Sequence, residues 1–295
     1  MEAGSRHWAQ RSAYPILLVS CYELGHQPFS LASPLAALES AGFQPRAADS
    51  HVEPLPDEVI QAARLVAISV PMHTALRLAE GVAQRVRQLN PSAHVCMYGL
   101  YAWLNADYLL RESGVENRES GVGSREPGIA LCHAERREAS GPLGADSSQA
   151  RNDKAGTPLA DSIIGGEFEA ALVDLACWLE DPSESRPAGV RMPGLPAEPV
   201  VSRLEFEVPQ RAGLPLLDRY ARFEREGQSL LAGYVEASRG CKHTCTHCPI
   251  TPVYGGRFFV VPREIVLADI RQQVQAGARH ITFGDPDFLN GPTHS

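Results

Sequence analysis

Short apolar runs alternate with amphipathic stretches through the first third of the chain. Unbroken apolar runs predict strands that are buried on both faces, over 14–20, 64–70 and 94–98, and a shorter run predicts another over 44–49. The stretches between them have helical spacing and predict helices over 31–41, 56–63 and 74–89. Strand–helix units in series are typical of α/β proteins with a doubly wound parallel sheet.

The pattern is interrupted between about 112 and 160, where neither the strand period nor the helix period is present. A strand over 161–166 and a helix over 167–180 then resume the sheet pattern. The simplest interpretation is a disordered insert in a loop, because loop-closure entropy grows slowly with loop length. The alternative is a folded insert that uses Cys132 and His133 as metal ligands.

A proline-rich stretch over 181–230 follows, and we expect it to link two regions. Within it, 200–208 is predicted to form a strand and 217–226 a short helix. From 231 to 295 the pattern predicts one further strand–helix–strand unit, with strands over 234–238 and 279–283 and a helix over 265–276.

Ligands of open parallel sheets bind outside the carboxyl ends of the strands. The loops over 20–28, 69–73 and 99–102 are therefore candidate binding loops. Composition excludes some kinds of ligand. Acidic residues outnumber basic ones, 35 to 27, which argues against a nucleic-acid or membrane-surface partner. No apolar run approaches the ~18 residues that cross a bilayer, and no signal peptide is evident, so we expect a cytoplasmic protein.

Three of the seven cysteines are clustered, and they carry the strongest chemical signal. Cys241, Cys245 and Cys248 follow a predicted strand with the spacing C-x3-C-x2-C. Three thiolates can hold a [4Fe–4S] cluster and leave one iron open for another ligand. Zinc requires a closed tetrahedron, so it would have to recruit His243 or His247 as well. A zinc-stapled binding module is therefore the alternative to an iron–sulfur enzyme.

The segment around these cysteines, GYVEASRGCKHTCTHCPI, resembles the signature of the radical S-adenosylmethionine (SAM) superfamily. The resemblance implies an enzyme whose [4Fe–4S] cluster, reduced by an external electron donor, cleaves SAM to a 5′-deoxyadenosyl radical. It also implies that 231–295 is the first β-α-β of a partial TIM barrel. The second strand of that unit ends at Gly284 and Asp285, which the resemblance makes candidate SAM-binding residues.

The first 180 residues resemble the cobalamin-binding, flavodoxin-like Rossmann domain that precedes the barrel in one subgroup of this superfamily. The loops over 22–28 and 165–169 carry the likeness. The resemblance implies cobalamin contacts from Ser69, Val70 and Gly99. The D-x-H-x-x-G motif of other cobalamin proteins is absent, so we expect no histidine ligand to cobalt from this chain.

The tandem order and the sequence GDPDFLNGPTH are similar to the radical SAM proteins named for a CUAEP/CCAEP tail. We therefore expect an N-terminal fragment of such an enzyme, with cobalamin-dependent methyl transfer as a candidate reaction. About 47 residues follow Cys248, which is too few for a whole barrel, so we expect the chain alone to be inactive. An inactive remnant of an interrupted gene is the remaining alternative. The substrate is not predicted.

Overall fold

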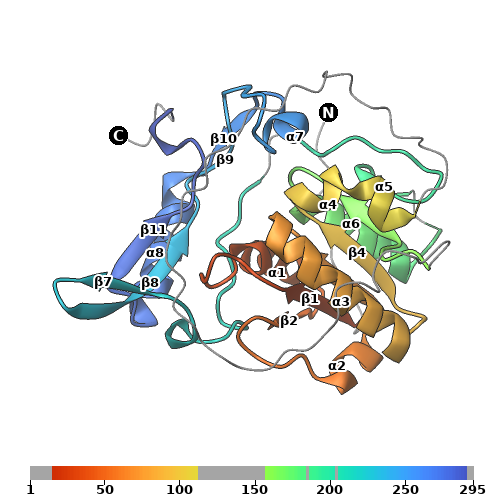
Figure 1. Cartoon of the computed structure of the whole chain (residues 1–295), viewed down its shortest axis with the longest axis horizontal. Coiled ribbons are helices and arrows are strands. Elements are labelled where there is room, and N and C mark those ends of the chain that lie inside the picture. The colour runs from red at the N-terminus through yellow and green to blue at the C-terminus, as the bar shows by residue number, and fades with distance from the viewer. Residues whose placement is uncertain (1–14, 112–156, 184–185, 203–204, 291–295) are drawn as a thin grey trace, which may run out of the picture.

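The computed structural model describes residues 15–111, 157–183, 186–202 and 205–290 (Figure 1). The predicted insert, together with its two candidate ligands, lies outside the described residues except for its last few positions. The described chain forms a large α/β half followed by a smaller half that contains the clustered cysteines.

The large half is built on one sheet with the strand order β2-β1-β3-β4-β5-β6. Its strands are β1 (Ile16–Ser20), β2 (Arg46–Asp49), β3 (Leu65–Ser69), β4 (His94–Tyr98), β5 (Ser162–Ile164) and β6 (Val190–Arg191). All neighbours pair in parallel except β5 and β6, which are antiparallel. The strand order reverses between β1 and β3, which is the switch point where open sheets of this kind bind ligands. The predicted doubly wound parallel sheet is confirmed.

Helices cover both faces of this sheet (Figure 1). They are α1 (Phe29–Ser40), α2 (Asp57–Ala62), α3 (His73–Leu89), α4 (Leu100–Leu104), α5 (Ala106–Leu110) and α6 (Glu169–Glu180). Helices α1 and α6 pack on one face and the other four on the opposite face. Strand β1 shows why its apolar run is unbroken, since Leu17 and Val19 enter one core while Ile16 and Leu18 enter the other.

A proline inside α1 is accommodated by a tyrosine from the sheet. Pro34 has no N–H, so the carbonyl of Ser30 loses the helical partner that it would otherwise have. The hydroxyl of Tyr98, on β4, donates to that carbonyl at 2.8 Å. The buried polar group is therefore satisfied, and α1 continues to Ser40.

The smaller half contains two short sheets and two helices. Strands β7 (Arg222–Arg225), β8 (Gln228–Val235) and β11 (His280–Phe283) form one sheet, and β9 (Ser238–Gly240) and β10 (Phe258–Val260) form the other. Helix α7 (Thr251–Tyr254) lies between β9 and β10, and α8 (Arg263–Gln275) crosses from β10 to β11. Strands β8 and β11 are parallel, so β8-α8-β11 is the strand–helix–strand unit that the sequence predicts.

Two predictions in the linker are wrong. The described residues of 200–208 form no strand, and only Val200 pairs, in an isolated bridge with Gly166. Residues 217–226 form a 3₁₀ turn and then strand β7 instead of a helix. The cause is the Glu226-Gly227 turn, in which both residues have positive φ (51° and 77°), the geometry of a tight β-hairpin that pairs β7 with β8.

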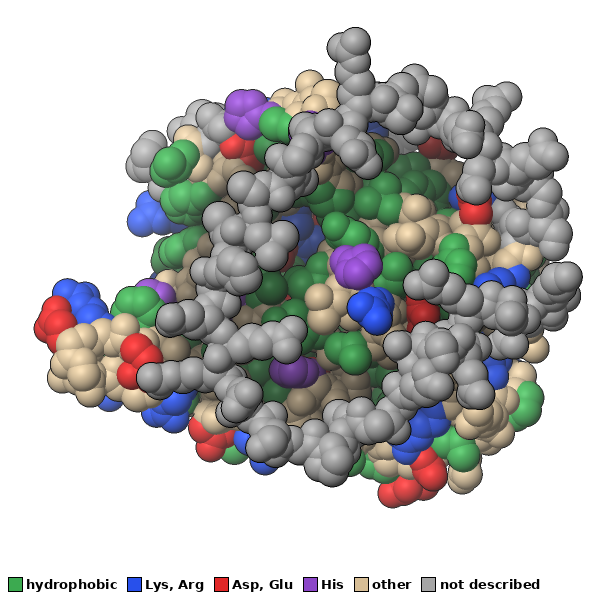
Figure 2. Space-filling model, viewed as in Figure 1, with side chains coloured by type: hydrophobic (Ala, Val, Ile, Leu, Met, Phe, Trp, Pro, Cys, Tyr) green, Lys and Arg blue, Asp and Glu red, His purple; other side chains and the backbone are tan. Residues whose placement is uncertain are grey.

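The β7–β8 hairpin projects from the molecule and carries exposed charges of both signs, as the left of Figure 2 shows. Arg222, Glu224 and Arg225 line its outer strand, and charged side chains of this kind discourage pairing of an edge strand with another chain. The described helices are all too short or too polar to span a lipid bilayer.

Candidate functional site

A cavity of about 420 Å³ lies between the two halves. The loops that follow β1, β3, β4 and β5 form one wall, and the segments after β8, β9 and β11 form the other. Of the predicted binding residues, Ser69, Gly99 and Gly284 line this cavity together. Val70 is buried behind the wall, where its carbonyl accepts the N–H of Tyr101.

Two of the cavity glycines are required by close packing. Gly99 has a φ of +103°, and a Cβ there would lie 3.2 Å from the carbonyl oxygen of Val70. A Cβ on Gly284 would lie 1.7 Å from the hydroxyl oxygen of Tyr234. Each glycine therefore lets the backbone form the cavity wall where a side chain has no room.

The two aspartates of the Gly-Asp-Pro-Asp sequence after β11 hold the backbone on either side of the first cysteine, Cys241. Asp285 accepts hydrogen bonds from the N–H of Ala237 and the hydroxyl of Ser238. Asp287 is buried and accepts the N–H of Lys242 at 3.0 Å. The carboxylate of Asp285, predicted as a SAM contact, is thus engaged within the chain, and sequence reasoning missed Asp287.

The cysteine segment, residues 241–257, connects the antiparallel strands β9 and β10. Its base is closed by a hydrogen bond from the N–H of Cys241 to the carbonyl of Arg257, at 3.2 Å. Cys241 and Cys248 are half-buried, Cys245 is exposed, and all three are free thiols. Burial and the neighbouring Asp287 raise the pKa of the Cys241 thiol.

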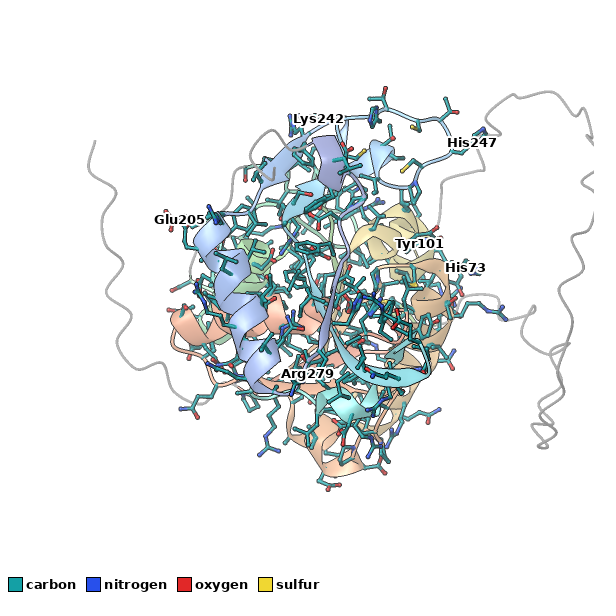
Figure 3. All side chains as sticks on the ribbon, turned by 90° about the vertical axis from the view of Figure 1, so that its left-hand side faces the viewer. His73, Tyr101, Glu205, Lys242, His247 and Arg279 are labelled. Atoms are coloured by element: carbon teal, nitrogen blue, oxygen red, sulfur yellow. The ribbon has the colours of Figure 1, made fainter. Side chains whose placement is uncertain are left out.

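The three thiols are not gathered around a point in this structure. Within the described ranges, no group of three or more histidine, cysteine, aspartate or glutamate side chains is placed to hold a metal ion. The predicted ligand set of Cys241, Cys245 and Cys248 therefore stays a prediction. Figure 3 shows His247 and Lys242 on this same segment, at the top of the molecule and well away from His73.

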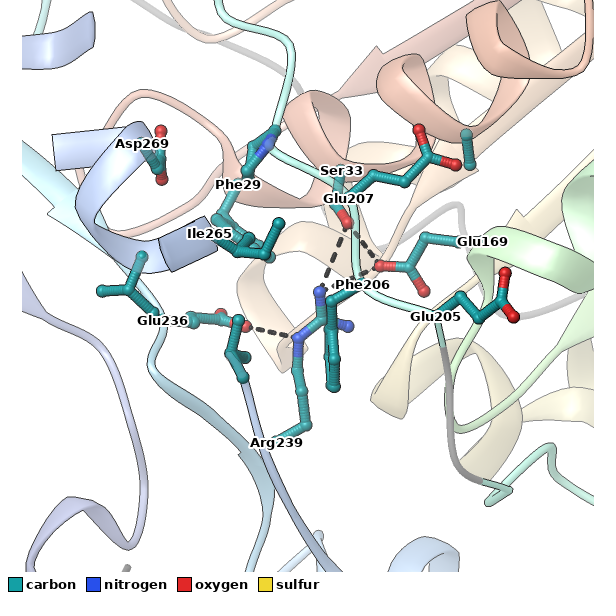
Figure 4. A pocket seen from close by; sticks show the side chains of 14 residues that line it. Phe29, Ser33, Glu169, Glu205, Phe206, Glu207, Glu236, Arg239, Ile265 and Asp269 are labelled. Atoms are coloured by element: carbon teal, nitrogen blue, oxygen red, sulfur yellow. Dashed lines mark hydrogen bonds and ion pairs between the residues drawn. The ribbon is translucent and has the colours of Figure 1, made fainter. Parts of the chain in front are cut away.

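One buried arginine joins the cysteine segment to the large half (Figure 4). Arg239, on β9, forms ion pairs with Glu167 at 3.0 Å and Glu169 at 2.9 Å, both from the loop and helix after β5. Its Nε lies 3.0 Å from a carboxylate oxygen of Glu236, and its guanidinium also donates to Ser33. Sequence reasoning missed this group, although the Gly-Gly-Glu-Phe-Glu sequence (165–169) carries the likeness to a cobalamin-binding domain.

No family model matches the chain, and no curated protein matches it significantly. Among solved structures it is similar to the radical S-adenosylmethionine methyltransferase TsrM from Kitasatospora setae, in a structure with tryptophan substrate and a SAM analog (aza-SAM) bound. A second TsrM structure has cobalamin and a [4Fe–4S] cluster bound.

The chain shares the fold of TsrM. Both alignments have a TM-score of 0.60 and cover 96% of this chain, at 15% and 16% sequence identity. The chain spans about half the length of TsrM, since the alignments cover 49% and 51% of the TsrM chains. The α/β fold with a parallel sheet is therefore established.

Two further carboxyls face the cavity near Arg239. Burial raises the pKa of Glu236 to about 8, although Arg239 lowers it, and neighbouring carboxylates raise it further by smaller amounts. Burial likewise raises the pKa of Glu23 to about 7, against two hydrogen bonds from Ser30 that lower it. The raised pKa values of both carboxyls have burial as their main cause, because removal from water disfavours the charged form.

The raised pKa of Glu236 predicts that the protein loses stability as pH rises from 6 to 8.5. The folded state keeps a proton that the unfolded state, with an ordinary glutamate pKa of about 4.3, has already released. The stabilisation is complete below the unfolded pKa and is lost as pH rises through about 8. We expect wild-type protein to lose about 2 kcal/mol of unfolding free energy over this interval through Glu236.

Urea denaturation of Glu236→Gln at both pH values checks this prediction. The variant should lose markedly less stability than wild type across the interval, because its neutral amide does not titrate. Glu58→Gln, on the exposed start of α2, is the matched control and should follow wild type. Equal losses in wild type and Glu236→Gln would contradict the prediction.

Proposed function

We propose that this chain belongs to a cobalamin-dependent radical SAM enzyme. The observation that carries the proposal is the placement of the C-x3-C-x2-C segment beside the cavity at the carboxyl ends of a parallel sheet. The shared fold with TsrM, a radical SAM methyltransferase of which one structure has cobalamin and a [4Fe–4S] cluster bound and another a SAM analog, supports it.

The donor set fits an iron–sulfur cluster better than a closed zinc site. Cys241, Cys245 and Cys248 are three free thiols on one segment, with no disulfide among them. A closed zinc site would need a fourth ligand such as His243 or His247, whereas a [4Fe–4S] cluster takes three thiolates and leaves one iron open. We assign the three cysteines to a [4Fe–4S] cluster, which when bound supplies the electron that cleaves SAM to methionine and a 5′-deoxyadenosyl radical.

In this proposal, residues of the chain contact SAM and hold the cysteine segment in place. Gly284 offers bare backbone in the cavity wall beside the cysteine segment, as a SAM-contacting strand end requires. Asp285 supports SAM binding indirectly, by fixing Ala237 and Ser238 at the base of the segment. Asp287 holds the N–H of Lys242, next to the first cysteine.

The opposite wall of the cavity is the proposed cobalamin site. Ser69 and Gly99 end neighbouring parallel strands there, and Val70 supports Gly99 from behind. An open cavity between two halves of a protein suits a large cofactor, because each half can contact one face of it. Methyl transfer to an unassigned substrate is the proposed reaction, with an external electron donor. Membership of the CUAEP/CCAEP-tail group and a cytoplasmic location stay predictions.

Anaerobic reconstitution of the full chain with iron and sulfide tests the proposal. We expect about four irons per chain, a brown protein, and retention of hydroxocobalamin through gel filtration. Binding of one zinc ion without iron uptake would overturn the cluster assignment in favour of a zinc-stapled module. Iron uptake without corrinoid retention would overturn the cobalamin assignment alone.

A further inference from the structure

Glu167 occupies an unusual position between the two halves of the protein. It follows Gly165 and Gly166 in the loop after β5, and its side chain is fully buried. Its backbone N–H donates to the carbonyl of Val200 at 2.7 Å, so the main chain that carries the carboxylate is fixed. Gly166 and Phe168, on either side of it, line the cavity.

The carboxylate of Glu167 contacts both ends of the cysteine segment. One oxygen lies 3.0 Å from a guanidinium nitrogen of Arg239, two residues before Cys241. The other accepts the hydroxyl of Tyr254 at 2.8 Å, six residues after Cys248. A single side chain of the large half therefore holds both the start and the end of the cysteine segment.

Other contacts make this arrangement rigid. Glu169 holds the second guanidinium nitrogen of Arg239 at 2.9 Å, so the guanidinium plane is set by two carboxylates. A Cβ on Gly240 would lie 2.6 Å from the ring of Tyr254, which shows that the two ends of the segment pack directly on each other. Both ends are thus held by the same loop of the large half.

We propose that Glu167 is a positioning residue for the three cysteines, holding their segment over the cavity through Arg239 and Tyr254. The inference rests on the proposed function, because it concerns where a cluster would stand. The hydrogen bonds of Glu167 join it to Arg239, Tyr254 and Val200, so its effect on the cysteines is through the mobility and placement of their segment. Charge-assisted hydrogen bonds of this buried kind are the stronger ones in proteins, so losing either should loosen the segment measurably.

Amide hydrogen exchange of the metal-free full chain tests the clamp itself. Glu167→Gln weakens the contact with Arg239, and Tyr254→Phe removes only the hydroxyl. We expect exchange of the amides in 241–257 to rise about tenfold in each variant, which corresponds to about 1.4 kcal/mol. Glu58→Gln and Tyr108→Phe, on exposed helix surfaces, are the matched controls and should exchange like wild type. Unchanged exchange in 241–257 in both test variants would overturn the clamp.

A second measurement separates positioning from simple stabilisation. After reconstitution, the two test variants should bind iron like wild type, yet release it to a chelator about tenfold faster. They should also show a broadened electron paramagnetic resonance spectrum of the reduced cluster. Altered exchange with an unchanged spectrum and release rate would overturn the positioning role. Absence of iron uptake by wild type would instead overturn the proposed function, and the exchange result would then decide the clamp alone.

Discussion

Replacing any one of Cys241, Cys245 and Cys248 with alanine is expected to lower reconstituted iron from about four per chain to below one. Each thiolate would supply one of only three protein bonds to the cluster, so a two-cysteine segment cannot retain it. Iron and sulfide analysis of the three variants, with the visible absorption spectrum, measures the effect. Global folding should be unaffected, because the segment lies outside the hydrophobic core clusters of the described chain.

Two control variants make this result specific. Cys177→Ala removes a buried thiol on α6, far along the chain from the segment, and should bind iron like wild type. His247→Ala separates the two metals, since an iron–sulfur cluster should survive it whereas a zinc site that uses this imidazole should not. Full iron content in any of the three cysteine variants would refute the assignment of that cysteine.

Arg239→Met is expected to destabilise the protein by about 3–5 kcal/mol. The substitution leaves Glu167 and Glu169 buried without a counter-charge, and desolvated carboxylates are costly unless paired. Methionine retains most of the aliphatic length, so the lost charge and hydrogen bonds dominate the effect. Equilibrium urea denaturation of reduced protein under anaerobic conditions measures it.

The pH dependence of this destabilisation identifies its cause. Lowering the pH towards 5 protonates the orphaned carboxyls and should recover much of the lost stability, which a pure packing defect would not do. Arg225→Met, on the exposed β7–β8 hairpin, should change the unfolding free energy by less than about 0.5 kcal/mol. A loss below about 1 kcal/mol in Arg239→Met would show that the ion pairs contribute little.

The sequence pattern was most informative where secondary structure is decided locally. Strand β4 begins and ends where predicted, at His94 and Tyr98, because a strand buried on both faces needs an unbroken apolar run. Helix α3 differs from its predicted range only by His73 at its start. Ser69 ends β3 and Gly99 follows β4, so both lie at the carboxyl edge of the parallel sheet, where the cavity is.

The pattern failed where distant residues decide the structure. The stretch over 217–226 was predicted as a helix, but pairing with β8 makes Arg222–Arg225 a strand. Arg239 and Glu167 are 72 positions apart along the chain. The spacing of apolar residues predicts helices and strands, but it does not predict contacts between such distant residues. Asp287 was missed for the same reason, since its partner Lys242 lies 45 positions away.

The shared carboxylate of Glu167 has a consequence for dissection of the protein. A fragment that ends after α6 would carry Glu167 and Glu169 without Arg239, and the remaining fragment would carry the guanidinium without its acids. In each fragment these charged side chains would have to become exposed to solvent or change their protonation state, whereas the intact chain buries them as ion pairs. The two halves therefore carry complementary buried charges, and a chimera that replaces the smaller half would fold only if the replacement brought a cation to the same place.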